Sequence, residues 1–365
     1  MKRRLFLSAA ASAALPSVAK AQSPSALLRS TNLPTLRWRM ATSWSKRLYV
    51  RFGSIDFLCQ RVSAMTEGNF TITPYGVNEI ASGLKVMDAV ADGTVECGHT
   101  AGYYYIDKQP ALGLATSIPF GLNAQQQLAW LQQGGLEAIQ AIYRDFNIIN
   151  FPAGSSGAQM GGWFKQKVTR VDDLKGLKMR IPGLGGEVMK RLGVDVQSLA
   201  GDEIYEHLER GDIEAAEWAG PHEDEKLGLN RVADHYYYPG WWEPGTTYEL
   251  QINLSQWNQL PKPYQEVLKV ASLEAHERML AEYDAANGAA LQQLLTSGTQ
   301  LSAFSSEILQ AAQDAAFELY EETATRDDTF RQVYNQWQTF RTEISRWHRI
   351  NEFKLKQFYA TAALS

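Results

Sequence analysis

A basic side chain beside a glycine-rich turn is the first feature of this sequence that could do chemistry. Arg180 lies in a strand-like segment, 178–182, and Gly183-Leu184-Gly185-Gly186 follows at the expected start of a helix. Backbone N–H groups at a helix start are free to donate to an anion. The glycines lack the G-x-G-x-x-G spacing of a dinucleotide site, so a tight strand-to-helix turn is the simpler interpretation. Together with Arg180, the turn suits an anionic ligand.

Two sets of acidic residues offer other chemistry. The run His222-Glu223-Asp224-Glu225 contains possible metal ligands. It follows Pro221, however, and is interpreted as the solvated first turn of a helix, where acidic residues are favoured. Glu217 and Glu243 could form the carboxylate pair of a secreted glycosidase, which is the alternative function. The sequence contains no G-x-S-x-G, H-E-x-x-H, P-loop or C-x-x-C motif.

Length and composition restrict the class of protein. The chain has 365 residues, 45% of them apolar and 21% charged, which is enough for about two ordinary domains with a sizeable core. A formal net charge of −5 argues against a nucleic-acid binder, which needs a basic face. The two cysteines, Cys59 and Cys97, are too few for a disulfide scaffold or an iron–sulfur cluster. The longest apolar runs are too short to cross a membrane.

The N-terminus reads as an export signal. Residues 1–21 combine a basic start, a short apolar stretch and a final Ala19-Lys20-Ala21 that resembles a cleavage site. The adjacent Arg3-Arg4 resembles a twin-arginine signal, and an ordinary Sec signal is the alternative. Cleavage would leave 31 Lys and Arg against 40 Asp and Glu, a net charge of −9. Export predicts a periplasmic location, where Cys59 and Cys97 either pair or remain two separately buried thiols.

The elements that must position these residues follow two similar patterns. The first pattern alternates strands and helices and predicts a mainly parallel sheet flanked by helices; its segments are 37–42, 49–65, 70–75, 84–91 and 95–98. The second predicts a strand, two helices and a strand, at 178–182, 187–192, 203–209 and 213–218. Aligning 89–96 with 207–214 matches Gly93 to Gly211 and Glu96 to Glu214, which indicates two lobes of similar build or a chance resemblance between common turns.

The last part of the chain is rich in helix-forming residues from about Pro263. Apolar residues at alternating steps of three and four form a heptad-like seam; they are Phe330, Val333, Trp337, Phe340, Ile344 and Trp347. Asp327-Asp328 supplies a cap, and a helix over 328–358 would be ~45 Å long at ~1.5 Å per residue. This helix either packs along its own two lobes or forms a dimer contact.

Several motifs resemble those of the periplasmic solute-binding proteins of TRAP transporters (the DctP-like family). The most specific is Asp173–Arg180, DLKGLKMR, supported by Val86–Gly93 and Ser117–Phe120, and the resemblance covers nearly all of 36–325. Four further segments resemble the branch of the family that binds 2-oxo acids: Ser155–Gln159, Arg180–Gly186, Ala216–Trp218 and Tyr237–Glu243.

The resemblance implies an α/β fold with two lobes around a central ligand cleft and a long C-terminal helix. The expected divisions are an export signal at 1–21, a linker at 22–35, lobe 1 at 36–152 with 243–285 returning to it, lobe 2 at 153–242 with 286–325, and a dimerisation helix at 326–365. The implied function is capture of pyruvate and longer 2-oxo monocarboxylates in the periplasm and their delivery to the membrane subunits of a TRAP transporter. The resemblance also implies that no reaction is catalysed.

The resemblance also assigns site residues. Arg180 would bind the ligand carboxylate, since a guanidinium offers two parallel donors and stays charged. Tyr103, rather than Tyr104 or Tyr105, Gln159 and Trp218 would contact the ligand; Trp218, Trp241 and Trp242 would wall the pocket. Gln159, Glu217, Glu243 and the carbonyl of Trp218 would hold a metal ion, with Na⁺ favoured over Ca²⁺. His99, which aligns with Glu217, is interpreted as structural.

Overall fold

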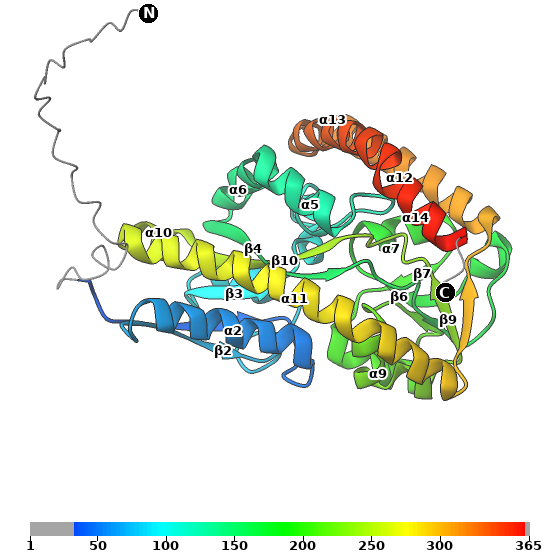
Figure 1. Cartoon of the computed structure of the whole chain (residues 1–365), viewed down its shortest axis with the longest axis horizontal. Coiled ribbons are helices and arrows are strands. Elements are labelled where there is room, and N and C mark those ends of the chain that lie inside the picture. The colour runs from blue at the N-terminus through cyan, green and yellow to red at the C-terminus, as the bar shows by residue number, and fades with distance from the viewer. Residues whose placement is uncertain (1–32, 362–365) are drawn as a thin grey trace, which may run out of the picture. The chain divides into compact units, whose positions relative to one another are not determined.

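Two β-sheets with helices packed on them make up the fold (Figure 1). The structure is a computed structural model that describes residues 33–361. The predicted export signal at 1–21, nearly all of the predicted linker and residues 362–365 therefore lie outside the described residues. From Pro34 onward the described chain forms one compact unit.

The first sheet has the strand order β2-β1-β3-β10-β4. Its strands are β1 (Leu36–Thr42), β2 (Phe70–Tyr75), β3 (Cys97–Thr100), β4 (Ile148–Gly157) and β10 (Thr246–Asn253). β1 pairs in parallel with β2 and β3, as the alternating pattern predicts, but β10 is antiparallel to both β3 and β4. The expectation of a mainly parallel sheet is therefore wrong, because the chain passes from β9 (His235–Tyr238) of the second sheet to β10 of the first without a crossover helix between them.

The second sheet has the order β11-β9-β5-β8-β6-β7 and is also mixed. Its strands are β5 (Trp163–Phe164), β6 (Lys178–Arg180), β7 (Asp195–Gln197), β8 (Ala215–Ala216), β9 (His235–Tyr238) and β11 (Gln300–Ala303). β6 is parallel to β7 and β8, whereas β5 is antiparallel to β8 and β9. Arg180 is the last residue of β6, in the interior of this sheet.

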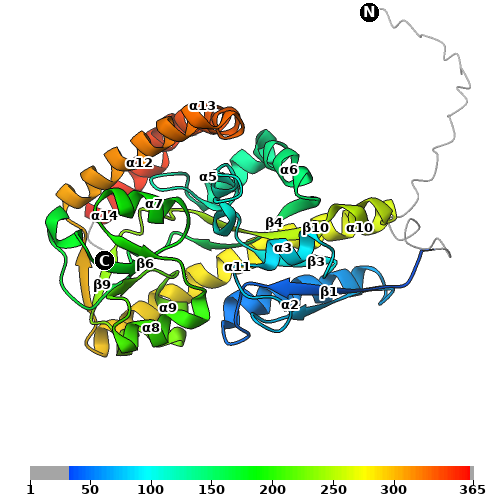
Figure 2. The same ribbon diagram turned by 180° about the vertical axis from the view of Figure 1, so that it is seen from behind.

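The helices surround the two sheets (Figures 1 and 2). The α-helices are α2 (Tyr49–Met65), α3 (Val86–Ala91), α4 (Leu112–Thr116), α5 (Ala124–Trp130), α6 (Leu136–Asp145), α7 (Gly183–Arg191), α8 (Ile204–Arg210), α9 (Pro221–Leu227), α10 (Leu254–Gln259), α11 (Lys262–Thr296), α12 (Ser306–Arg326), α13 (Asp328–Ile350) and α14 (Glu352–Thr361). Short 3-10 or π turns are η1 (Gly102–Tyr105), η2 (Leu131–Gly135), η3 (Val171–Leu174), η4 (Gly201–Glu203) and η5 (Leu229–Arg231). None of the helices at 33–361 is both long and apolar enough to span a membrane.

The two aligned helix–Gly–strand units adopt the same local structure. Gly93 joins α3 to β3 and Gly211 joins α8 towards β8, with φ values of +80° and +81°, a region that favours glycine. The side chain of Glu96 accepts a hydrogen bond from the backbone N–H of Arg39 on β1, at 2.7 Å. Glu214 likewise accepts from the backbone N–H of Lys178 on β6, at 3.2 Å. These matching contacts support two units of similar build, one in each sheet.

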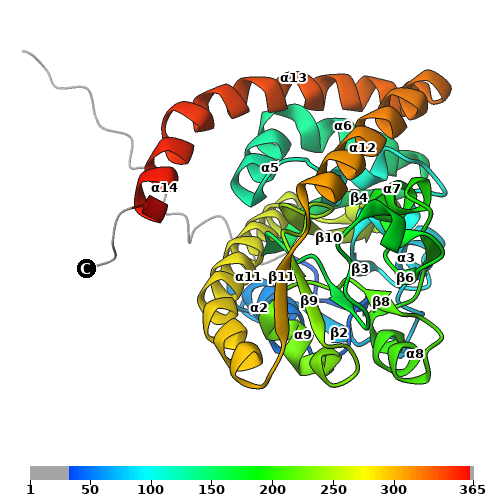
Figure 3. The ribbon, with the colours of Figure 1, turned by 90° about the vertical axis from the view of Figure 1, so that its right-hand side faces the viewer.

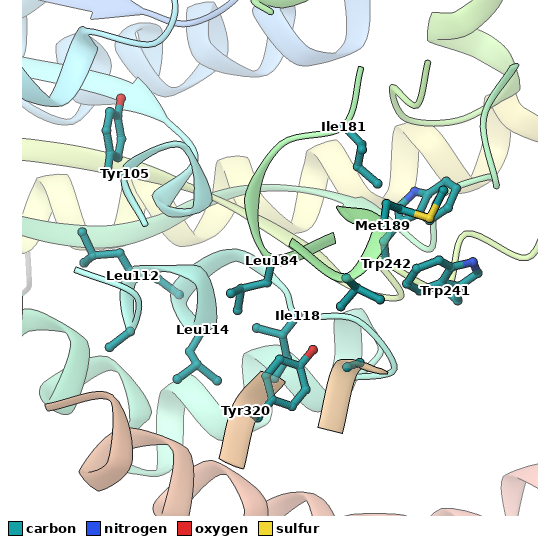
Figure 4. Packing of buried hydrophobic residues seen from close by; sticks show 14 of the residues in the cluster. Tyr105, Leu112, Leu114, Ile118, Ile181, Leu184, Met189, Trp241, Trp242 and Tyr320 are labelled. Carbon is teal, nitrogen blue, oxygen red and sulfur yellow. The ribbon is translucent and has the colours of Figure 1, made fainter. Parts of the chain in front are cut away.

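The long helix α11 and one buried cluster connect the two sheets. α11 contacts α2 and β4 of the first sheet and α9 beside the second (Figure 1). The hydrophobic cluster likewise includes residues from both parts of the chain, among them Leu112 and Ile118 on one side and Ile181, Leu184 and Trp242 on the other (Figure 4). The helix α11 and this cluster therefore hold the two sheets together.

The predicted C-terminal helix is interrupted. α13 ends at Ile350 and α14 begins at Glu352, with a bend between them (Figure 3). The side chain of Asn351 accepts from the backbone N–H of Glu352 at 2.5 Å, a local hydrogen bond that competes with continuation of the helix. The seam divides at about the same point: Phe330, Val333 and Trp337 are buried against the chain's own core, whereas Trp347 is 59% exposed.

Candidate functional site

Arg180 is buried at the end of β6, and part of its guanidinium group is hydrogen-bonded to the protein. The side chain is 1% exposed. Its Nε donates to the carbonyl of Leu199 at 3.0 Å, and its Nη1 donates to the carbonyl of Glu217 at 3.0 Å and also contacts the Glu217 carboxylate. Its Nη2 has no hydrogen-bond partner among the described residues. A buried, permanently charged donor thus remains free to bind an anion.

Gln159, Glu217 and Glu243 are brought to the same site. Gln159 Nε2 donates to Glu243 Oε2 at 2.7 Å, and Glu243 Oε2 also accepts from Thr246 at 2.7 Å. Within residues 33–361, Gln159 Oε1 and Glu217 Oε2 are buried without a donor. These two orphaned oxygens and the Glu243 carboxylate are the kind of ligands that a hard cation prefers, so the residues present fit a bound Na⁺ or Ca²⁺.

Tyr103 and Gly183, which pack closely against each other, form one wall of a small cavity. Tyr103 lies in η1, directly after β3, and is 6% exposed. The cavity has a volume of about 10 Å³ and its lining includes Tyr103, Ser117, Gly183, Trp242 and Glu243. A Cβ atom at Gly183 would lie 2.9 Å from the Cβ of Tyr103, and the backbone there has φ +64°, so this approach requires glycine.

Trp218 seals the other side of the site. Its ring is 5% exposed and lies 5.5 Å from the guanidinium carbon of Arg180. A Cβ atom at Gly201 would fall 2.2 Å from this ring, so the indole packs directly on the backbone. Trp242 borders the small cavity, whereas Trp241 stacks on Phe120 at 5.1 Å. Of the three tryptophans expected at the pocket, Trp218 thus lies over Arg180, and Trp242 borders the same small cavity as Glu243.

Burial controls the electrostatics of the two carboxylates. Burial raises the pKa of Glu243 to about 7, although the Thr246 hydrogen bond and the Arg180 charge act in the opposite direction. Burial likewise raises the pKa of Glu217 well above its usual range, against the nearby Arg180 guanidinium and with a further rise from the Glu243 charge. Glu217 and Glu243 therefore have too little positive charge near them to stabilise their ionised forms. A bound cation would supply that charge.

The acidic run at the start of α9 differs from its sequence interpretation. Pro221 occupies the first turn as expected, but Glu223 and Asp224 are fully buried rather than solvated. Asp224 accepts from Trp163 Nε1 at 2.9 Å and from the Tyr236 hydroxyl at 2.7 Å, so hydrogen bonds compensate its burial. Sequence reasoning missed this because the donors lie on distant strands.

Four other residues have structural or unassigned places. Cys59 and Cys97 are buried free thiols, which selects the second of the two alternatives left open by the sequence. His99 accepts from Trp44 Nε1 at 2.8 Å and lies 3.3 Å from the Ala153 carbonyl, a structural role. Ser117, which was given no role, borders the small cavity with a buried hydroxyl that finds no partner in the described part of the chain.

A buried cationic donor and orphaned oxygen acceptors, enclosed between two sheets, define a receptor for a small anion. The chain belongs to the bacterial extracellular solute-binding protein family 7 (DctP), whose profile matches residues 40–327. Members of this family bind solutes and are not enzymes, so the glycosidase alternative is discarded.

Three similar proteins refine the comparison. A monocarboxylate 2-oxoacid-binding periplasmic protein of Nostoc sp. is 57% identical over 367 residues, covering 99% of this chain and 100% of that protein. A TRAP transporter solute-binding protein from Bordetella bronchiseptica, a mixed-occupancy dimer with copurified calcium and picolinate, has a TM-score of 0.88 and 42% identity over 89% of this chain and 97% of its own. One from Pseudoalteromonas atlantica, with bound sodium and pyruvate, has a TM-score of 0.86 and 33% identity over 88% and 99%. These matches establish the two-lobed fold of TRAP solute-binding proteins.

Proposed function

We propose that this chain captures small 2-oxo monocarboxylates in the periplasm and delivers them to a TRAP transporter. The observation that carries the proposal is the free Nη2 of Arg180 beside the orphaned oxygens of Gln159 and Glu217, all buried in one site. A donor for a carboxylate and acceptors for a cation are what a metal-assisted 2-oxo acid site needs. The Nostoc, Bordetella and Pseudoalteromonas relatives support this ligand class.

Each site residue then has a role. Arg180 binds the ligand carboxylate, while Tyr103 and Trp218 enclose the ligand from opposite sheets. Gln159, Glu217, Glu243 and the Trp218 carbonyl hold the cation, which supplies positive charge to the site. A 2-oxo acid presents a carboxylate and a neighbouring keto oxygen, both good acceptors for a hard cation.

Na⁺ is the ion we favour, with Ca²⁺ as the alternative. Two carboxylates, one arginine and one monoanionic ligand leave two net negative charges at the site. Na⁺ would leave one of these charges uncompensated, and Ca²⁺ would neutralise both. The relatives hold sodium in one case and calcium in another.

The test is ligand-dependent stability of the purified mature chain. We expect the melting temperature to rise with pyruvate or 4-methyl-2-oxopentanoate when Na⁺ or Ca²⁺ is present, and much less after chelation and desalting. Pyruvate has six heavy atoms, so the ceiling of about −1.5 kcal/mol per atom limits its affinity to the sub-micromolar range. The proposal fails if no 2-oxo acid raises the melting temperature in either salt.

Arg180→Lys isolates the carboxylate contact. Lysine keeps a positive charge beside Glu217 but loses the free second donor, so we expect pyruvate affinity to fall at least about tenfold. Arg191→Lys is the matched control in the same part of the chain, because Arg191 forms a partly exposed ion pair with Glu322 at 2.8 Å. Equal affinity of the two variants would remove Arg180 from the ligand site.

We also propose the bounds of the two lobes and the way in which two copies of the chain assemble. We place lobe 1 at 36–152 and 243–285, and lobe 2 at 153–242 and 286–325. We also infer a homodimer formed through the C-terminal helices at 326–365. Large apolar side chains there are exposed, a groove of about 500 Å³ lies between α5, α13 and α14, and the Bordetella relative is a dimer.

A further inference from the structure

Arg51 is a second buried arginine close to the proposed site, and the sequence motifs give it no role. It lies near the start of α2, which packs on the first sheet and on α11. Its side chain is 1% exposed. Within residues 33–361, Arg51 and Arg180 are the two arginines whose side chains are buried. A buried charge of this kind needs a specific set of partners.

The partners of Arg51 form a cage of three rings and one carboxylate, and its Nε donates to the Tyr283 hydroxyl at 3.3 Å. Its guanidinium carbon lies 4.6 Å from the ring centre of Trp44, 4.7 Å from that of Trp218 and 4.5 Å from that of Tyr248. Its Nη2 lies 2.9 Å from Glu223 Oε2, and the Glu223 side chain is fully buried. Cation–π contacts of this geometry are strongest when they are desolvated, as these are.

The cage joins the two sheets. Arg51 and Trp44 follow β1 in sequence, and Tyr248 lies on β10, so these three residues belong with the first sheet. Trp218 follows β8 and Glu223 lies on α9, both with the second sheet. The ion pair between Arg51 and Glu223 therefore bridges the two sheets, as does the contact of Arg51 with the Trp218 ring.

Two short chains of contacts lead from this cage to the proposed cation ligands. Trp218 is adjacent to Glu217 in sequence, and its Nε1 donates at 3.2 Å to Glu223 Oε2, the oxygen that pairs with Arg51. On the other side, the Tyr248 hydroxyl donates to Ser156 Oγ at 3.2 Å. Ser156 Oγ in turn accepts from Gln159 Nε2 at 3.1 Å. Arg51 thus touches the residues that fix the positions of both Glu217 and Gln159.

We propose that Arg51 is a positioning residue that assembles the cation and ligand site across the two sheets. A purely structural role explains it poorly, because a buried ion pair is rarely more stable than apolar residues of the same volume. Arginine suits the positioning role, since its planar guanidinium can stack on several rings while pairing with a carboxylate. The inference rests on the proposed function, because it concerns the same site.

The experiment compares Arg51→Met/Glu223→Gln with the wild type. The double change removes both charges together, and the new glutamine keeps an oxygen for Trp218 Nε1. We expect the apo protein to stay folded, and Ca²⁺ and pyruvate affinities measured by calorimetry to fall about 10- to 100-fold. A drop in the apo melting temperature with unchanged Ca²⁺ affinity would identify a structural role and overturn the inference.

Two further variants keep the test decisive. Arg51→Lys retains the charge that Glu223 needs but not the planar stacking face, so it should fold and still lose affinity; wild-type affinity in this variant would also overturn the inference. Arg61→Met is the matched control, since Arg61 on the same helix pairs with Glu274 at 2.7 Å with both side chains more than a third exposed. If the wild type itself binds no 2-oxo acid with either Na⁺ or Ca²⁺ present, the proposed function fails and takes this inference with it.

Discussion

The polar side chains of the site each use one end within the protein and keep the other end free. Arg180 engages Glu217 through Nη1 while Nη2 finds no partner in the described structure, and Gln159 donates to Glu243 while its Oε1 likewise accepts from no described group. A buried polar atom without a partner costs about 1–3 kcal/mol. A ligand that supplies one acceptor and one cation would relieve this cost at several atoms together. The free ends therefore explain why an acidic protein can select an anion.

Glu243→Gln tests the cation half of this arrangement at the residue scale. The amide oxygen can still accept from Gln159, but one of the two carboxylate charges is lost. We expect Ca²⁺ affinity measured by calorimetry to fall at least about tenfold, and Na⁺ dependence of pyruvate binding to weaken. Glu187→Gln is the control, because Glu187 pairs with Lys190 on the surface of α7. Unchanged Ca²⁺ affinity in Glu243→Gln would remove Glu243 from the cation site.

At the scale of elements, local sequence patterns predicted the helix bounds and caps, which depend on residues close together in the chain. The segment 49–65 forms α2 with the predicted bounds, and Asp327 caps α13 by accepting from Phe330 N–H at 2.7 Å. The antiparallel insertion of β10 was not predictable in this way, because its partners β3 and β4 lie about a hundred or more residues earlier in the chain. The sequence did not reveal a role for Arg51 for the same reason: apart from Trp44, the groups around it (Trp218, Tyr248 and Glu223) lie more than 150 residues later in the chain.

The bend at Asn351 separates a helix that packs on its own chain from one that is free to pack on another. Phe353 and Phe358 of α14 are 57% and 62% exposed. Exposed apolar groups of this size in one short helix mark an interaction surface. We expect Phe353→Asp/Phe358→Asp to convert the proposed dimer to a monomer in light scattering, without lowering the melting temperature of the fold.

Lys354→Asp/Gln357→Asp is the control for that change, since it adds acidic residues to the same helix without touching its aromatic side chains. A dimer that survives Phe353→Asp/Phe358→Asp would place the contact elsewhere. Deletion of the whole region 326–365 is a poorer test, because Phe330, Val333 and Trp337 belong to the buried core. Their removal would expose that core and confuse loss of assembly with loss of folding.

At the scale of the whole molecule, burial shifts the pKa of several ionisable groups in the direction that favours their neutral forms. Burial raises the pKa of Glu249 to about 7, although hydrogen bonds from Tyr143 and Asn150 act in the opposite direction. Burial raises the pKa of Asp224 to about 6 and lowers those of His99 and His276 to about 4. Such groups make the free energy of unfolding depend on pH, because the folded and unfolded chains bind different numbers of protons.

The directions of these pKa shifts predict that the ligand-free protein is most stable in mildly acidic solution. A carboxyl group with a raised pKa, such as Glu249, stabilises the fold fully below its unfolded value near 4.5, and this contribution is lost as the pH rises through 7. A histidine with a lowered pKa, such as His99, stabilises the fold above 6.5, and this contribution is lost as the pH falls through 4. The melting temperature of the apo protein should therefore decline between pH 5.5 and 8.

Glu249→Gln measures how much of this decline in stability comes from Glu249, because glutamine resembles the protonated carboxyl group at every pH. The full shift of Glu249 corresponds to about 3 kcal/mol. Denaturant titrations at pH 5.5 and 8 should show a smaller loss of unfolding free energy in Glu249→Gln than in the wild type. The exposed Glu266→Gln should keep the wild-type loss. If all three proteins lose stability equally, the pH dependence arises from other carboxyl groups and Glu249 is ionised in the folded protein.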